Sequence, residues 1–406
     1  MVTKLKRMSP TLRLYIIIVA LSALAAGLSG GVLSNYFKDA YQVTAEQRGL
    51  IEFPRELPGV ITIFVIALLA GFSDIKIAMF ANVLGIIGIL VLGVFTPTYN
   101  VMLIFIFIHS MGSHMAMPLR DAIGMDLIKG GNTGKRMGQF KGVYTGFTMV
   151  AMLITFIGYR AGIFSFTSEV KWIFIVSALV MLSVLILYSV LSKMIDHKIV
   201  SDKRVRFVFR KEYKYYYILT VMYGVQKQIM LVYGPWVLIE LLDKKVDTLA
   251  ILSIIGSFVG IFFIPALGRW IDKYGLKKLL YVDALSFIGV YIAYGILSAL
   301  FKAGNIPTVG LPVLMTFILY IIDKMSNQMA MIRTIYLKSI LVQPSDFTAT
   351  LSLGLSLDHV VSISCAIAAG FIWDSFGPQY IFFAAAAMSF VNLFVATKVV
   401  IPENFS

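Results

Sequence analysis

Two stretches of the sequence match each other: His109-Ser-Met-Gly-Ser-His-Met-Ala-Met117 and Asp323-Lys-Met-Ser-Asn-Gln-Met-Ala-Met331. Both contain Met-x-x-x-Met-Ala-Met inside a long apolar run, both are polar where membrane helices rarely are, and an arginine (Arg120 or Arg333) follows each one. A duplication separated by about half the chain indicates a membrane protein built from two similar halves. In such proteins the solute site lies near the bilayer midplane, at the interface between the repeats.

The composition also indicates a membrane protein. The chain has 406 residues, of which 59% are hydrophobic and 14% are charged, whereas a soluble domain has about 25% charged residues. A net charge of +14 would suggest a nucleic-acid partner for a soluble protein. Here Lys and Arg cluster in alternate loops, as the positive-inside rule requires, so we expect a lipid bilayer and no nucleic acid. The single cysteine, Cys365, excludes an internal disulfide and a thiolate metal cluster.

The lengths of the apolar runs predict an all-α membrane protein with twelve transmembrane helices, because about 20 apolar residues span the hydrocarbon core. The first run is too long for the core of a signal peptide, and further spans follow it, so we interpret it as a helix. The predicted helices cover 12–36, 47–70, 76–95, 100–127, 137–159, 171–192, 214–240, 246–268, 277–300, 311–335, 349–372 and 379–400.

The charge pattern predicts the domain organisation and the topology. The longest polar stretch, 193–213, is rich in Lys and Arg and separates a six-helix half, 1–192, from a second six-helix half, 214–406. An even number of spans places both termini on one side, and the more basic loops place that side in the cytoplasm. The compact chain and its short loops favour a prokaryotic plasma membrane.

The segment after residue 268 is Gly268-Arg-Trp-Ile-Asp272-Lys273-Tyr-Gly275-Leu-Lys-Lys278. It resembles the signature loop of the major facilitator superfamily: Gly, three residues, Asp, a base, any residue, Gly, and then further bases. Gly268 would permit a close approach of helices, Asp272 can cap a helix or pair with a base, and Gly275 allows a turn. The resemblance implies a gating loop on the cytoplasmic side.

Shorter segments extend the resemblance over the whole chain. The equivalent first-half loop keeps its acid as Asp74 but lacks the second Gly and most of the bases. Gly370-Phe-Ile-Trp-Asp-Ser-Phe-Gly377 resembles the family's junction between helices 11 and 12, and Arg120-Asp-Ala-Ile-Gly124 has the spacing of its helix-4 motif. The resemblance implies two pseudo-symmetric six-helix halves that rock about a central site. It identifies no subfamily, and the helix over 137–159 lacks the Gly-Pro-x-x-Gly-Gly type signature of drug/proton antiporters.

The second predicted helix has an acidic and basic group near its extracellular end. Glu52 and Glu56 share a face at a spacing of four residues, with Arg55 between them, and Pro54 and Pro58 loosen the backbone ladder. One interpretation is that a glutamate takes up and releases a proton, while Arg55 pairs with this glutamate or with an anionic solute. The alternative is a structural Glu–Arg pair that joins this helix to a neighbour.

Lys227 lies about twelve residues into the seventh helix, near the midplane, where a lone cation is costly and needs a partner. It can face an anionic solute, or it can pair with Asp323 of the tenth helix, which also contributes Lys324 at similar depth. By the resemblance, helices 1, 4, 7 and 10 line the central cavity, and two lysines there suit a carboxylate-bearing or zwitterionic solute. The other side chains assigned to solute binding are Gln226, Tyr233, Asn327, Gln328 and His109.

Asp323 and three further ionisable residues are predicted to couple protons. Asp358 and His359 lie within the eleventh helix and point about 100° apart, so they do not pair with each other; they could also be satisfied core residues. Arg120 could organise coupling, or pair with Asp121 or a lipid phosphate. His109 and His114 are five residues apart, a spacing that does not place both on one helix face, so we predict no metal site and no cofactor.

These patterns favour a secondary transporter over an enzyme. No Gly-rich phosphate-binding loop followed by Lys and Ser/Thr is present in the sequence, and no Ser/His/Asp set has a catalytic spacing. We expect a monomer that carries an organic anion or zwitterion together with protons. Proton-driven export of amphipathic compounds, and a non-transporting sensor on the same fold, remain alternatives.

Overall fold

The computed structural model describes residues 9–69, 71–128, 133–195, 209–343 and 346–401, and the regular structure within these ranges is helical. The first half contains α2 (Pro10–Gly30), α3 (Leu33–Tyr41), α4 (Ala45–Leu68), α5 (Asp74–Val94), α6 (Tyr99–Asp126), α7 (Thr133–Arg160) and α8 (Trp172–Lys193). The second half contains η1 (Lys211–Tyr213), α9 (Lys214–Trp236), η2 (Val237–Leu241), α10 (Val246–Tyr274), α11 (Leu276–Lys302), α12 (Leu311–Gln328), α13 (Ala330–Ser339), α14 (Asp346–Ser375) and α15 (Pro378–Lys398).

These elements confirm the predicted twelve helical segments. Three segments are subdivided: α3 follows α2 after Gly31, η2 continues α9, and α13 follows α12 after Met329. One predicted boundary is wrong, because α10 continues past Gly268 to Tyr274. The chain then reverses at Gly275, whose φ of +80° favours glycine, and α11 begins at once. The expected loop over 268–278 is therefore mostly helix.

The described residues fall into two compact units. Unit 1 lies within residues 1–41, 57–205 and 246–251, and unit 2 lies within residues 42–56, 206–245 and 252–406. The first turns of α4, up to Glu56, therefore belong to unit 2, whereas the rest of α4 belongs to unit 1. The expected basic linker, 193–213, lies largely outside the described residues.

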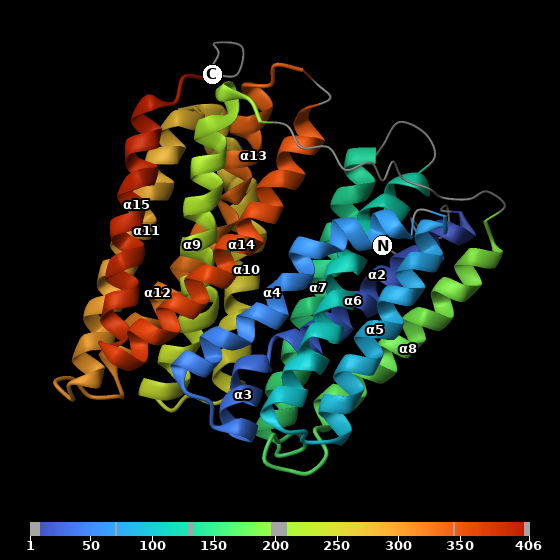
Figure 1. Cartoon of the computed structure of the whole chain (residues 1–406), viewed down its shortest axis with the longest axis horizontal. Helices are drawn as coiled ribbons and strands as arrows, with labels where there is room; N and C mark the ends of the chain where they lie inside the picture. The colour runs from blue at the N-terminus through green and yellow to red at the C-terminus, as the bar shows by residue number, and fades with distance from the viewer. Residues whose placement is uncertain (1–8, 70, 129–132, 196–208, 344–345, 402–406) are drawn as a thin grey trace. The chain divides into compact units, whose positions relative to one another are not determined.

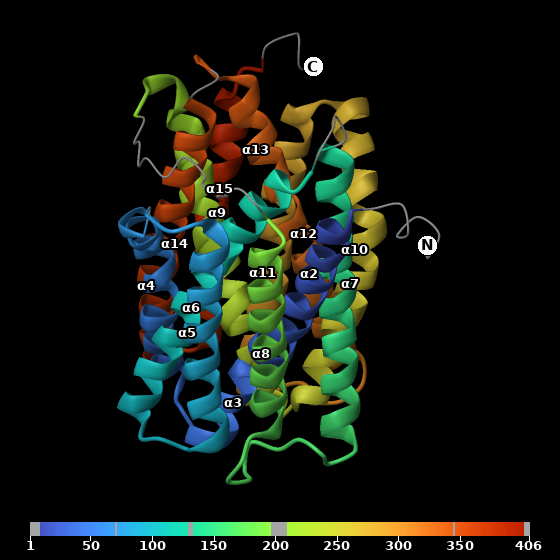
Figure 2. The same cartoon turned by 90° about the vertical axis from the view of Figure 1, so that its right-hand side faces the viewer.

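Unit 1 is a bundle in which α5 packs along α6 and α8, and α2 packs along α7 and α8 (Figures 1 and 2). Its core contains large apolar side chains from α2, α5, α6 and α8, among them Tyr15, Ile75, Met115 and Val184. Close backbone approach explains the tight contact of α5 with α6, since a Cβ added to Gly88 would lie 2.5 Å from the backbone nitrogen of His109.

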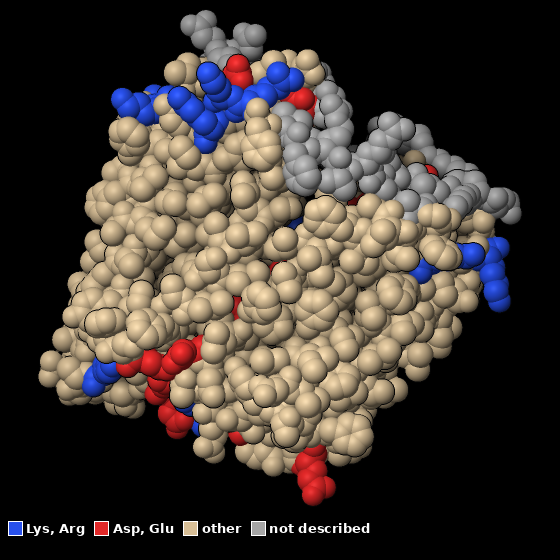
Figure 3. Space-filling model, viewed as in Figure 1, with Lys and Arg blue, Asp and Glu red and all other residues tan. Residues whose placement is uncertain are grey.

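Unit 2 is a bundle in which α9 packs against α14 and α15, and α11 packs along α15 (Figures 1 and 2). At the end where α9 begins, the Tyr213 hydroxyl donates to Asp346 Oδ2 at 2.9 Å, and Arg210 Nε donates to the same oxygen at 2.6 Å. Lys and Arg side chains gather at this end (Figure 3), as the positive-inside rule expects of one side of a membrane protein.

Nine helices among the described residues are long and apolar enough to cross a membrane. The three predicted spans that do not meet this criterion contain α4, α9 and α12. These helices carry most of the ionisable side chains that the sequence assigns to the site. Polar residues inside membrane helices are costly and therefore usually functional. The low apolarity of α4, α9 and α12 therefore indicates that the candidate site lies on these helices.

Candidate transport site

The first turns of α4 pack closely against α14 in unit 2. A Cβ added to Gly370 of α14 would lie 2.6 Å from the Ala45 carbonyl oxygen of α4, so glycine is required for this approach. The Tyr233 hydroxyl of α9 stabilises this contact between α4 and α14, because it donates to the Ala366 carbonyl at 2.7 Å and to the Ala45 carbonyl at 3.4 Å. Tyr233, predicted to bind solute, is thus fully buried and stacked on Trp373.

Glu52 is the centre of a buried ionic group on this face of α4. Arg48 Nη1 donates to Glu52 Oε1 at 2.5 Å, Arg55 Nε lies 3.2 Å from Oε2, and Gln228 Nε2 of α9 donates to Oε2 at 2.7 Å. Glu52 is fully buried. Two guanidinium groups and an amide therefore stabilise its ionised form, and protonating it would separate two buried ion pairs.

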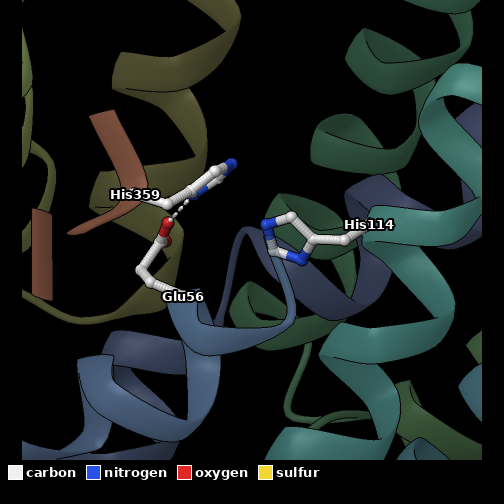
Figure 4. Close-up of side chains that lie close together, drawn as sticks. All are labelled: Glu56, His114 and His359. Carbon is white, nitrogen blue, oxygen red and sulfur yellow. Dashed lines mark hydrogen bonds and ion pairs between the residues drawn. The ribbon is translucent and has the colours of Figure 1, made fainter. Parts of the chain in front are cut away.

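Glu56, one turn further along α4, joins this helix to α14. His359 Nδ1 lies 2.8 Å from Glu56 Oε2 (Figure 4), and Arg55 Nη2 donates to Oε1 at 3.1 Å. His114, also labelled in Figure 4, belongs to unit 1, where its Nδ1 lies 3.0 Å from the Ser110 carbonyl oxygen.

Lys227 of α9 forms an ion pair with Asp358 of α14. The alternative pairing of Lys227 with Asp323, suggested by their similar depth, is wrong, because Asp358 is the acid that α14 presents to α9. Glycine again permits the contact: a Cβ added to Gly224 of α9 would lie 2.8 Å from Asp358 Oδ1. Asp358 and His359 diverge as predicted, the first toward Lys227 and the second toward Glu56.

These contacts form one charged cluster, comprising Arg48, Glu52, Arg55, Glu56, Lys227, Gln228, Asp358 and His359. With His359 neutral, its three cations balance its three carboxylates. Exposure within it is uneven: the side chains of Arg55, Lys227 and His359 are 22%, 23% and 17% exposed, whereas the carboxylates are almost completely buried. The exposed surface of the cluster therefore consists of cationic and imidazole groups, and its carboxylates are buried beneath them.

Asp323 of α12 differs from the other buried acids of unit 2. Its bonds are to neutral donors: the Tyr291 hydroxyl lies 3.3 Å from Oδ1, and Asn327 Nδ2 lies 2.7 Å from Oδ2. The adjacent Lys324 ammonium lies 4.9 Å from the centre of the Tyr320 ring, and no cation among the described residues forms an ion pair with Asp323. Protonation of Asp323 would therefore break no buried ion pair.

Gln226 lies beside Lys227 in the sequence but points into the core. Its Nε2 donates to the Ser389 hydroxyl at 2.5 Å, its Oε1 accepts from Asn392 Nδ2 at 3.1 Å, and its carbonyl accepts from the Tyr291 hydroxyl. The predicted solute contact at Gln226 is thus placed in an interhelical network with α15 and α11. Gln328, at the end of α12, is exposed.

The predicted site residues of unit 1 have contacts within their own unit. His109 is buried against α5, with Nδ1 3.1 Å from the Gly85 carbonyl oxygen. The Arg120 guanidinium lies over the Tyr144 ring at 4.1 Å, and its carbonyl accepts from the Tyr15 hydroxyl. Asp74, the expected first-half loop acid, is the first residue of α5 and is fully buried.

The proposed gating segment is exposed at the end of α10. Asp272 and Lys273 are solvent-facing, and the Lys273 ammonium lies 5.2 Å from the Tyr274 ring. The expectation that Gly268 permits a close helix approach is wrong, because an added Cβ would meet no described atom within 4 Å. The expected role of Gly275 in the turn agrees with its positive φ.

Sequence reasoning missed several buried charges, among them Arg48 and Asp283. Arg48 lies four residues before Glu52, a spacing that predicts their contact, and a lone Asp283 in an apolar span also signals a buried partner. That partner is Arg333, whose Nη1 donates to Asp283 Oδ2 at 2.9 Å and whose guanidinium lies 3.8 Å from the Tyr223 ring. The sequence analysis identified Arg333 as part of the repeat but predicted no partner for it.

We expect Gly370→Ala to destabilise the fold by about 1–3 kcal/mol, the usual cost of overpacking, because the methyl group would displace the backbone of α4. The midpoint of thermal unfolding in detergent should fall. Gly289→Ala in α11 is the matched control, since its Cβ would meet open space, and its midpoint should hold or rise. Equal midpoints for both variants would contradict the close contact of α4 with α14.

Comparison with known proteins identifies the family. The sequence model of the Major Facilitator Superfamily matches residues 15–337. The chain belongs to this superfamily. A comparison with curated protein sequences finds no match.

Several solved transporter structures share the fold of this chain. The nucleoside transporter NupG aligns with a TM-score of 0.73 at 14% identity, covering 96% of this chain and 99% of the other. A POT family transporter in complex with 5-aminolevulinic acid aligns at 0.75 and 13% identity, covering 95% and 96%. The inward-open xylose transporter XylE from E. coli aligns at 0.67 and 15% identity, covering 97% and 96%. These similarities show that the chain shares the fold of these transporters.

Proposed function

We propose that this superfamily member is a secondary active transporter that carries a small organic anion or zwitterion together with protons by alternating access. The observation that supports it most is the balanced charged cluster of α4, α9 and α14, in which Lys227, Arg55 and His359 keep exposed surface while the acids are buried. Because charges inside membrane proteins are costly and usually functional, we assign this cluster to solute binding.

The Lys227–Asp358 pair suits a zwitterion in particular. A solute carboxylate can replace Asp358 at Lys227 while a solute ammonium group pairs with Asp358, so that no buried charge loses its partner. Arg55 and His359 lie in the same cluster and would contact the remainder of the solute. The POT family transporter of similar fold was solved with 5-aminolevulinic acid, which is such a zwitterion, and this agrees with the proposal without establishing the solute of this chain.

Among the predicted proton-coupling residues, we assign the proton to Asp323. Glu52, Glu56 and Asp358 each pair with a cation, so protonating any of them separates an ion pair. Asp323 is bonded to the neutral Tyr291 and Asn327 and can change its protonation state without that cost.

The remaining features of the proposal follow from the charge pattern. The basic end of unit 2 faces the cytoplasm under the positive-inside rule, so both termini lie in the cytoplasm. The compact chain and its short loops favour the plasma membrane of a prokaryote. The two halves, 1–192 and 214–406, move as a monomer around the site, and the basic stretch 193–213 joins them. The 268–278 segment and Asp74 act in gating.

A thermal-shift screen of the purified protein tests the assignment of solute class. Carboxylates, amino acids, sugars and lipophilic cations are compared at two pH values, with the wild type and with Lys227→Ala. We expect stabilisation by an acidic or zwitterionic compound that is lost in Lys227→Ala. Stabilisation by lipophilic cations alone, indifferent to Lys227, would instead support export of amphipathic compounds.

A further inference from the structure

A cavity of about 410 Å³ opens on the surface of unit 2. Its floor is formed by α9 and its walls by α14 and α15, and it is bounded by large apolar side chains at Val225, Ile229, Ile372, Ile381 and Met388. Small residues such as Ala368 and Ala384 provide the width between these walls.

The cavity offers a ligand very few hydrogen bonds. Its two polar side chains are already bonded within the protein: the Ser364 hydroxyl donates to the Val360 carbonyl at 3.1 Å, and the Cys365 thiol lies 3.9 Å from the Val225 carbonyl oxygen. A buried water needs two to four polar partners, so water cannot occupy this space favourably. The chemistry of the lining therefore selects a hydrocarbon.

The position of the cavity places it in the hydrocarbon core of the bilayer. Its lining on α14 extends from Val360 to Ile372, which at 1.5 Å per residue corresponds to roughly 18 Å along the helix. Since adjacent residues are about 100° apart, the exposed lining residues Ser364 and Ala368 face away from His359, whereas Cys365 lies on the same face of α14 as Asp358. The exposed part of the lining therefore lies on the outer side of α14, where we expect lipid, whereas Val361 lies beside Asp358.

We propose that the cavity is a binding site for one acyl chain of a membrane phospholipid. The lining is apolar and elongated, lies at acyl-chain depth, and is open on the side that faces the bilayer. Its floor residue Val225 precedes Lys227 by two positions, and its wall residue Val361 follows Asp358 by three. A bound chain therefore packs α9 against α14 at the level of the Lys227–Asp358 pair. The site goes beyond the proposed transport function and does not depend on it.

Photocrosslinking of the full-length protein tests this site. The protein is reconstituted with phosphatidylglycerol that carries a diazirine on one acyl chain, irradiated, digested and mapped. We expect crosslinks to concentrate on the α14 and α15 residues that line the cavity. In Ala384→Phe, which fills the cavity, these crosslinks should fall at least fivefold. Ala387→Phe adds the same side chain to exposed surface of α15 outside the lining and should leave them unchanged.

Two results would overturn the proposal. The first is crosslinking spread evenly over exposed helices, or equal in Ala384→Phe and Ala387→Phe, since both describe unselective contact with bulk lipid. The second is occupation by another copy of the chain. Cys365 is the sole cysteine of the sequence and lies in the cavity, so efficient oxidative formation of a Cys365-linked dimer in the membrane would show that protein fills the space instead.

Discussion

Replacing Lys227 with Met is expected to abolish measurable uptake of the solute. The substitution removes the cation that we assign to the solute carboxylate and leaves Asp358 without its ion-pair partner. A hydrogen bond to a charged group contributes about 1.5–3 kcal/mol, which corresponds to a loss of affinity of roughly ten- to 150-fold. Affinity is measured by ligand-induced thermal shift, and uptake is measured in proteoliposomes.

The double variant Lys227→Met/Asp358→Asn separates binding from folding. Breaking one side of a buried pair costs about 3–5 kcal/mol, and we expect the lower end because Lys227 is partly exposed. Removing both charges should restore most of the thermal stability but not the affinity. Full recovery of affinity in the double variant would show that Lys227 has a structural role only, and the anion assignment would fail.

Replacing Asp323 with Asn is expected to uncouple transport from protons while the carrier keeps working. The amide preserves the size of the side chain and can bond with Tyr291 and Asn327, which are its present partners, but it cannot release a proton. Accumulation of solute driven by an imposed pH gradient should fall at least tenfold, whereas exchange of external for internal solute at equal pH should persist. Both rates are measured in the same proteoliposomes.

Asp283→Asn is the matched control for that experiment. It replaces another buried acid of unit 2, but one that pairs with Arg333 at 2.9 Å, so the variant leaves a buried cation without its partner and should lose thermal stability. Accumulation and exchange should then decrease together. A selective loss of accumulation in Asp283→Asn, with Asp323→Asn unaffected, would move the proton site to the Asp283–Arg333 pair.

The fold could be predicted from the sequence because it depends on coarse properties. Apolar length, alternate basic loops and the repeat at His109 and Asp323 are sufficient for twelve helices in two halves, and the segment over 268–278 adds the family resemblance. The end of α10 could not be predicted, since the residues from Gly268 to Tyr274 contain enough helix-forming and apolar side chains to continue the helix, and only Gly275 reverses the chain. Polarity alone suggested an earlier end.

The candidate site was harder to predict, because partners on different helices depend on rotation about each axis. Lys227 and Gln226 are neighbours in the sequence, yet a rotation of about 100° directs one to Asp358 and the other to Ser389. The sequence analysis named most of the charged residues that the structure brings into one cluster, but not Arg48. It could not distinguish Asp358 from Asp323 as the partner of Lys227, since both lie at a plausible depth.

The coupling of solute to protons is tested most directly by a pH-sensitive dye inside proteoliposomes, with the membrane potential clamped. The solute identified by thermal shift is added outside at equal internal and external pH. Our account predicts that its entry acidifies the lumen in the wild type and does not do so in Asp323→Asn. Entry of labelled solute without any change in pH, or with alkalinisation of the lumen, would contradict proton symport.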